Sequence, residues 1–321
     1  MRPRAISPEK YQRITTWALV ALVAIVVTGG AVRLTGSGLG CSDWPTCEED
    51  SLVAPLEFHP MVEFLNRLVT GVVSVAVAAA VAGSLLRRPR RPDLVWWSLG
   101  LVAGVVAQVV LGGLLVLSEL DPRFTIGHFL LSMVLVWNAT VLHRRAAEPP
   151  GPRRPVVDGA ALVLARLVTA VGVVVLVTGT IVTGAGPHGG DEEAERLNFE
   201  VQEVVRIHAL SVIALVALTL AAYRLVRRDP SAELLRRGLL GLMAVEVVQA
   251  AIGYAQYFTD VPPLLVGLHL LGASLVWIAA VEVWLRTTTP GAADTGAVPP
   301  PTDHRGDATG DEPASAAVTP G

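Results

Sequence analysis

Residues 203–226 read EVVRIHALSVIALVALTLAAYRLV, and this stretch shows the pattern that decides the fold. It is apolar except at its ends, it is long enough for a helix to cross a bilayer, and it carries His208 near one end. Seven similar stretches occur at residues 14–34, 62–86, 94–117, 124–143, 161–183, 234–257 and 263–285. The sequence therefore predicts an all-α integral membrane protein with eight transmembrane helices.

The composition agrees with a membrane protein. Hydrophobic residues make up 52% of the 321 residues and charged residues only 17%, whereas soluble domains carry about 25% charged residues. A soluble helical bundle would need polar helix faces, which these stretches lack. We also expect the first stretch to remain as a membrane span, because its apolar core is too long for a cleaved signal peptide.

Basic residues alternate between the two sides of the predicted spans. Arg and Lys gather before the first span, after the second and fourth, between the sixth and seventh, and after the eighth, whereas the opposite loops are acidic. The positive-inside rule predicts a multi-pass protein of the cell membrane with both termini in the cytoplasm. The net charge of −3 gives no reason to expect a nucleic-acid partner.

Two halves of the chain resemble repeats. Val27-Thr28-Gly29 recurs as Val177-Thr178-Gly179, and Gln108 and His128 precede Gln249 and His269 by the same interval. Asn66 then takes the position of His208. We predict two tandem four-helix bundles, residues 14–143 and 161–286, related by a pseudo-twofold axis along the membrane normal. Residues 1–13 would be a cytoplasmic N-terminus, 144–160 a cytoplasmic linker and 287–321 a disordered cytoplasmic tail, because the tail is too polar to bury a core.

Three predicted spans carry a histidine, and a fourth carries Asn66, each about one turn inside the outer end. Ionisable residues within a membrane are costly and mark function by default. His208 and His269 could meet across a four-helix core and hold a haem iron from both faces. The alternative is that each histidine only bonds to a neighbouring carbonyl or serine.

The corresponding pocket of the first half differs. Asn66 cannot supply a strong iron ligand, so His128 would bind axially and leave the other face open. Glu63, Asn66 and Arg67 share one helix face. Glu63 would then be a carboxylate beside an open coordination site, or else an ion-pair partner of Arg67 that stabilises the helix end.

The loop after the first span contains the two cysteines of the chain, Cys41 and Cys47. Both are expected on the oxidising side of the membrane, where a disulfide can form. Such a disulfide would be a local staple or a redox-active pair. A metal site is less favoured, because no histidine lies between the cysteines.

These motifs together resemble the haem A synthase family. The resemblance rests on Cys41, Trp44, Pro45 and Cys47, on Glu63-x-x-Asn66-Arg67, on Gly127-His128, on residues 183–188 (TGAGPH) and on His208 and His269. It covers essentially all eight spans. It implies an oxidoreductase that converts the C8 methyl of haem O to a formyl group, which gives haem A for cytochrome c oxidase.

The resemblance also implies roles for single residues. His208 and His269 would hold a haem b cofactor, while His128, with Asn66 and Arg67, would take the substrate haem. Glu63 would be the catalytic carboxylate, and Cys41 and Cys47 would form a disulfide. The implied partners are haem O synthase and an electron donor. A homo-oligomer is also compatible with the resemblance.

One residue departs from the family pattern, which has histidine where this chain has Asn66. Either His128 alone binds the substrate iron or the upstream His59 replaces the missing ligand. We favour the first, because His59 is predicted in the loop before the span. Two other functional classes stay open: a quinol-linked dihaem b-type electron carrier, which would need two complete ligand pairs, and a transporter built from repeats, which would not need the histidines.

Overall fold

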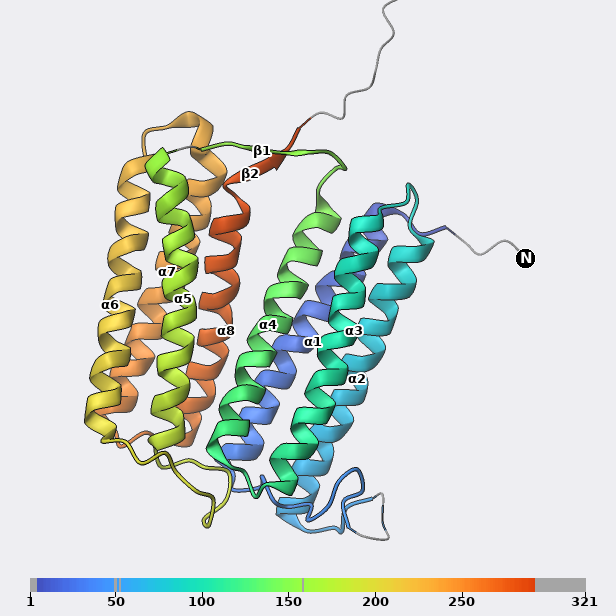
Figure 1. Ribbon diagram of the computed structural model, residues 1–321, viewed down its shortest axis with the longest axis vertical. Helices are drawn as coiled ribbons and strands as arrows, with labels where there is room; N and C mark the ends of the chain where they lie inside the picture. Colours follow the sequence, from blue (N-terminus) through green and yellow to red (C-terminus); the bar gives the residue numbers. More distant parts are fainter. Residues whose placement is uncertain (1–4, 49–50, 52, 158, 292–321) are drawn as a thin grey trace, which may run out of the picture.

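The computed structural model describes residues 5–48, 51, 53–157 and 159–291. Within these residues eight long helices follow one another: α1 (Pro8–Leu34), α2 (Phe58–Leu86), α3 (Pro92–Leu117), α4 (Pro122–Ala147), α5 (Gly159–Ala185), α6 (Val201–Val226), α7 (Glu233–Phe258) and α8 (Pro263–Leu285). All eight are long and apolar enough to cross a membrane. The predicted all-α, eight-span fold is confirmed (Figure 1).

The hydrophobic pattern did not predict the first residues of the helices accurately. Most helices begin a few residues before the predicted apolar run, and α1 begins at Pro8 rather than residue 14. Proline is favoured in the first turn of a helix, and it occupies that position in α1, α3, α4 and α8. Polar first turns are therefore helical although they lie outside the apolar run.

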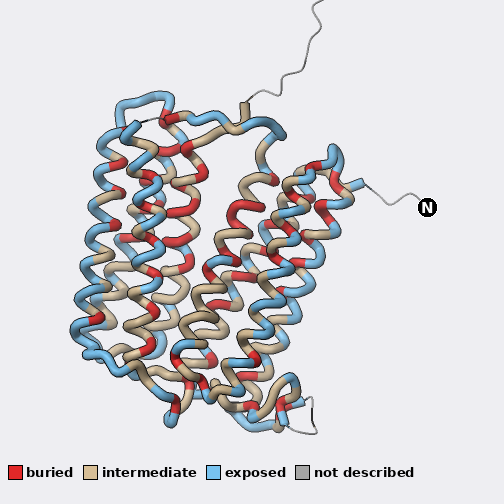
Figure 2. Tube along the Cα trace, in the orientation of Figure 1, coloured by how far each residue is buried: buried red, intermediate tan, exposed pale blue. Residues whose placement is uncertain are grey.

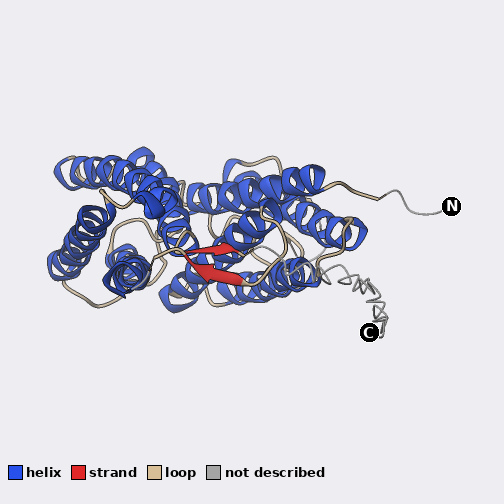
Figure 3. Cartoon of the chain, turned by 90° about the horizontal axis from the view of Figure 1, so that it is seen from above, coloured by secondary structure: helices blue, strands red, loops and turns tan. Residues whose placement is uncertain are grey.

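The helices pack as two groups of four. In one group α1 contacts α2 and α4, and α3 contacts the same two helices; in the other, α5 contacts α6 and α8, and α7 contacts the same two. This places α2 opposite α4, and α6 opposite α8. The groups meet where α1 and α4 pack against α8 and where α4 packs against α5 (Figures 1 and 3). The Trp277 indole N–H donates to the Met133 carbonyl across this contact, at 2.9 Å.

Buried residues line the inner helix faces and the contact between the two groups (Figure 2). Many of the exposed residues are large and apolar. Trp96 is 73% exposed and Val247 is 70% exposed. Apolar exposure on this scale, in helices long enough to span a bilayer, fits a lipid-facing surface.

A short sheet lies at the end of the molecule where α1 begins (Figure 1). Strand β1 (Arg153–Pro155) pairs antiparallel with β2 (Thr288–Pro290), and the Arg153 side chain donates to Thr288 Oγ1 at 2.9 Å. The short 3₁₀ helix η1 (Pro230–Ala232) precedes α7. The prediction that disorder begins at residue 287 is wrong for 287–291, because the linker strand supplies backbone partners for them. Residues 292–321 lie outside the described residues.

Candidate functional site

The four predicted ligand positions lie at the same end of the two helix groups. Asn66, His128, His208 and His269 follow the starts of α2, α4, α6 and α8 by six to eight residues. At 1.5 Å per residue they lie about 9–12 Å along their helices, which is deeper than the single turn predicted. For Asn66, His128 and His208 the reason is that α2, α4 and α6 begin before their predicted spans. Asn66 and His128 lie on α2 and α4, and His208 and His269 lie on α6 and α8. In each bundle these two helices stand opposite each other.

In the C-terminal half, His208 is oriented by a threonine. Its Nδ1 lies 3.1 Å from Thr178 Oγ1, and this hydroxyl also lies 2.9 Å from the Val174 carbonyl. When the hydroxyl donates to the carbonyl, it accepts the Nδ1 hydrogen of His208, and the lone pair of Nε2 remains free. Hydrogen bonds of this kind orient histidines that ligate metals.

His269 faces His208 from the opposite corner of the bundle. Within the described residues its imidazole makes no hydrogen bond, and its Nδ1 is buried. Its backbone is fixed, because Gln249 Nε2 donates to the His269 carbonyl at 3.0 Å. A buried imidazole without a partner is costly unless a ligand completes it.

Glycines stand against the imidazole rings. A Cβ built at Gly179 would lie 3.1 Å from Cε1 of His208, and one built at Gly253 would lie 3.2 Å from Cε1 of His269. These glycines leave room for an imidazole ring on the adjacent helix, α6 beside α5 and α8 beside α7. The free Nε2 of His208, the unpartnered His269 and this clearance are what two residues that would hold a haem iron require.

The N-terminal half repeats the arrangement around His128. Gln108 Nε2 donates to the His128 carbonyl at 3.0 Å, and a Cβ at Gly112 would lie 3.3 Å from the imidazole Cε1. The buried Nδ1 of His128 has no hydrogen-bond partner among the described residues. Because each of these contacts has a counterpart in the other half, they support the duplication, while the pseudo-twofold relation stays a prediction.

Asn66 occupies the position in the first half that His208 occupies in the second, but its side chain is an amide instead of an imidazole. Its Oδ1 accepts a hydrogen bond from Thr28 Oγ1 at 2.8 Å, and Thr28 is the residue that the repeat aligns with Thr178. The amide therefore takes up the threonine contact that the imidazole makes in the other half.

The ion pair between Glu63 and Arg67 is present, at 2.6 Å, and Glu63 is buried. The other Glu63 oxygen accepts the backbone N–H of Cys41 at 2.8 Å. Arg67 also donates to the carbonyls of Thr46 and Asp43, at 2.7 and 3.1 Å. The pair does more than stabilise its own helix, since it fastens the cysteine loop to α2.

The predicted disulfide between Cys41 and Cys47 is confirmed, and both residues are buried. Between them, the Trp44 ring packs on Gly113 of α3, where a Cβ would lie 2.9 Å from the ring. Gly113 follows the Gly112 that faces His128. The cysteine loop therefore lies over the end of the N-terminal bundle that holds Asn66 and His128.

His59 is not placed as predicted. It belongs to the first turn of α2 rather than to the preceding loop, and its Nδ1 lies 2.9 Å from Ser37 Oγ. It is exposed and lies about 10 Å along the helix from Asn66. This position supports His128, rather than His59, as the ligand of the first half.

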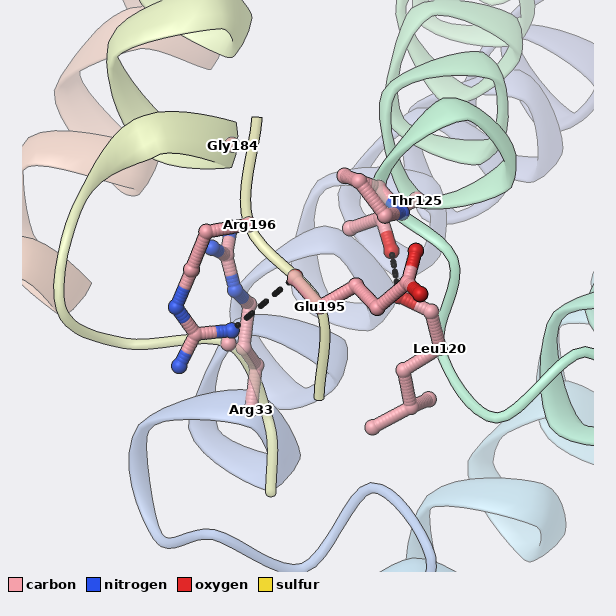
Figure 4. A pocket seen from close by; sticks show the side chains of 8 residues that line it. Arg33, Leu120, Thr125, Gly184, Glu195 and Arg196 are labelled. Atoms are coloured by element: carbon pink, nitrogen blue, oxygen red, sulfur yellow. Dashed lines mark hydrogen bonds between the residues drawn. The ribbon is translucent and has the colours of Figure 1, made fainter. Parts of the chain in front are cut away.

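A small cavity lies between the two halves (Figure 4), and no feature of the sequence predicted it. It has a volume of about 10 Å³, which is room for one water, and Arg33, Thr125 and Arg196 line it. Arg33 donates to the Thr183 carbonyl at 2.7 Å, and Arg196 donates to the Pro187 carbonyl at 3.0 Å. The cavity is too small for a haem. The Arg33 contact joins α1 to the last turn of α5, and the Arg196 contact lies within the loop after α5.

The comparisons with known proteins decide the family. The family model described as COX15-CtaA, cytochrome oxidase assembly protein, matches residues 12–59 and 53–189, which together exceed half of the chain. The chain belongs to this family. The matched region contains the cysteine loop, Glu63 and His128, and α8 with His269 lies beyond it.

Proteins named heme A synthase are among the relatives of this family member. The one from Geobacillus kaustophilus (strain HTA426) is 32% identical over 105 residues, which is 32% of each chain. The one from Geobacillus thermodenitrificans is 29% identical over 128 residues, 39% of this chain and 40% of the relative. The one from Rhizorhabdus wittichii (strain RW1) is 26% identical over 345 aligned positions, 86% of this chain and 95% of the relative. The chain thus spans only about a third to two fifths of the two Geobacillus relatives that it matches.

Proposed function

We propose that this membrane protein is a haem A synthase, an oxidoreductase that converts the C8 methyl of haem O to a formyl group and so gives haem A for cytochrome c oxidase. Membership of the cytochrome oxidase assembly family and the relatives named heme A synthase support the proposal. The observation that carries it is the set of three imidazoles, His208 and His269 in one half and His128 in the other, each of which keeps a nitrogen free for iron. Nothing in the comparisons favours an electron carrier or a transporter.

In this proposal the C-terminal half holds a haem b between His208 and His269. An iron with two histidine ligands is saturated and suits electron transfer. Thr178 fixes the tautomer and rotation of His208, and Gln249 fixes the backbone of His269. The chain thus supplies rigid ligands, as a resident cofactor requires.

The N-terminal half takes the substrate, haem O, through His128. It offers one imidazole rather than two, so it would bind its haem less firmly and could release haem A. The outer-end position of His128 would let a lipid-soluble haem enter from the bilayer. Arg67 would contribute to the substrate site indirectly, because it donates hydrogen bonds to carbonyls of the cysteine loop and so keeps that loop in position.

Glu63 is the proposed catalytic carboxylate. It lies one turn from Asn66 on the same face of α2 and is buried. It would accept protons as the methyl group is oxidised, or stabilise charge that develops there. Its hydrogen bonds from Cys41 and Arg67 would hold the carboxylate in one orientation.

The proposed setting is the cell membrane, with both termini in the cytoplasm and both haem sites toward the outer side. Haem O synthase would supply the substrate, and a separate electron donor would serve the haem b. The proposal does not depend on whether the protein forms a homo-oligomer.

The test is to express the full chain with a haem O synthase in a bacterium that makes no haem A. Haems are then extracted and identified by liquid chromatography and mass spectrometry. We expect haem A with the wild-type chain and none with His128→Ala. Haem O alone in the presence of folded wild-type protein would contradict the proposal.

A further inference from the structure

The threonine beside the ligand position is used differently in the two halves. Thr178 Oγ1 lies 2.9 Å from the Val174 carbonyl and 3.0 Å from Ser211 Oγ. A hydroxyl has one hydrogen to donate. With those acceptors close by, Thr178 is free to accept the Nδ1 hydrogen of His208, which leaves the lone pair on Nε2.

Thr28 has fewer neighbours. The residue that corresponds to Ser211 is Val69, which offers no hydroxyl, and the nearest helix carbonyl, that of Ile25, lies 3.3 Å away. The hydroxyl therefore donates to Oδ1 of Asn66, at 2.8 Å. In this half the threonine holds an amide oxygen where the other threonine holds an imidazole hydrogen.

This contact fixes which end of the Asn66 amide is free. Because Oδ1 faces Thr28, the NH₂ group takes the other position, and within the described residues it donates no hydrogen bond. It lies 4.0 Å from the position of a Cβ on Gly29, the glycine that corresponds to Gly179 beside His208. The first half thus presents two N–H donors at the position where the second half presents an iron ligand.

We propose that Asn66, held by Thr28, would donate a hydrogen bond to a small diatomic or anionic ligand of the substrate haem, so that this half would bind such a ligand. The proposal rests on the proposed function, which assigns that haem to His128. A neutral amide nitrogen does not replace imidazole as an iron ligand. Donors beside an open face, however, favour ligands that carry negative charge.

The experiment uses the full chain in lipid nanodiscs, loaded with added haem, and two probes. Carbon monoxide is added to the reduced protein, and its stretching frequency is read by infrared spectroscopy. Cyanide is titrated into the oxidised protein. The pair His208 and His269 saturates its iron, so both probes should report the N-terminal half alone.

Three variants separate the roles. Asn66→Leu keeps the size of the side chain but removes the N–H donors. Carbon monoxide should still bind to this variant, and its stretching frequency should rise. The Kd for cyanide should rise about tenfold or more. Asn66→His should supply a second imidazole, abolish carbon monoxide uptake and add a second low-spin signal. Leu65→Ala, which lies beside Asn66 but is exposed, is the matched control and should leave both probes unchanged.

Several results would overturn the inference. They are no carbon monoxide uptake by the haem-loaded wild type, the same frequency and cyanide affinity in Asn66→Leu, or undiminished uptake in Asn66→His. Haem A formation, measured in the same membranes, judges the proposed function separately. Haem A made by a chain that fails these ligand tests overturns the inference alone, and ligand binding that depends on Asn66 without haem A overturns the proposed function alone.

Discussion

At the scale of single residues, Glu63 marks the difference between the two halves, because Val205 occupies its position in the second half. Glu63→Gln keeps the shape of the side chain but removes the charge that pairs with Arg67. We expect the haem b spectrum to persist while haem A formation stops, with haem O or a hydroxylated intermediate accumulating. Extraction of haems from membranes checks this, and normal haem A production would move the chemistry away from Glu63.

Thr178 offers a second residue-scale prediction. Thr178→Val removes the hydroxyl beside His208 Nδ1 with little change in volume. Loss of such a hydrogen bond lowers metal affinity by about 10- to 100-fold in other sites, so haem b should be lost faster from the variant and its low-spin spectrum should shift. Thr178→Ser, which keeps the hydroxyl, is the control, and a variant that retains haem b as firmly as the wild type would remove the assigned role.

The sequence identified the histidines, Asn66 and Glu63 because charge and hydrogen-bonding groups stand out within apolar spans. It did not reveal what Thr28 and Thr178 contact. Threonine is common in membrane helices, and its partner depends on the rotation of two helices about their axes, which hydrophobic pattern alone leaves undetermined. Gly179 belongs to a motif that the repeat made visible, but its contact with the His208 imidazole could not be predicted for the same reason.

At the scale of elements, the cysteine loop is fixed from both sides. The disulfide closes it, and Arg67 holds its carbonyls from α2. Cys41→Ser with Cys47→Ser should lower the free energy of unfolding by about 2 kcal/mol, the value expected for so short a loop. Thermal unfolding in detergent measures this. Mass spectrometry of non-reduced peptides should show the crosslink, and two free thiols in fresh membranes would contradict it.

The helices themselves could be predicted because each needs one long apolar run, and their C-terminal ends fall within a few residues of the predicted ones. Strands β1 and β2 could not be predicted in the same way. They join residues 153–155 to residues 288–290, and a pairing of three residues across such a separation leaves no periodic signal in either segment.

At the scale of the whole molecule, the arginine clusters lead to a prediction of sidedness. The short connection after α2 holds Arg87, Arg88, Arg90 and Arg91 and should face the cytoplasm. A cysteine introduced as Arg88→Cys should react with a membrane-impermeant thiol reagent only after the membrane is opened. Glu57→Cys, at the other end of α2, should react in intact cells. The reverse pattern would invert the proposed orientation.

The two halves are expected to do different work, with haem b resident in one and haem O passing through the other. The most direct measurement is pyridine haemochrome analysis of four purified full-length proteins, the wild type, His128→Ala, His208→Ala and His269→Ala, each produced together with haem O synthase. We predict that the wild type contains haem b together with haem O or its oxidised products. His208→Ala should lose haem b from the folded protein, whereas His128→Ala should keep haem b and lose the substrate haem. Haem b that persists in both His208→Ala and His269→Ala, or a wild-type protein that contains no haem, would contradict the account.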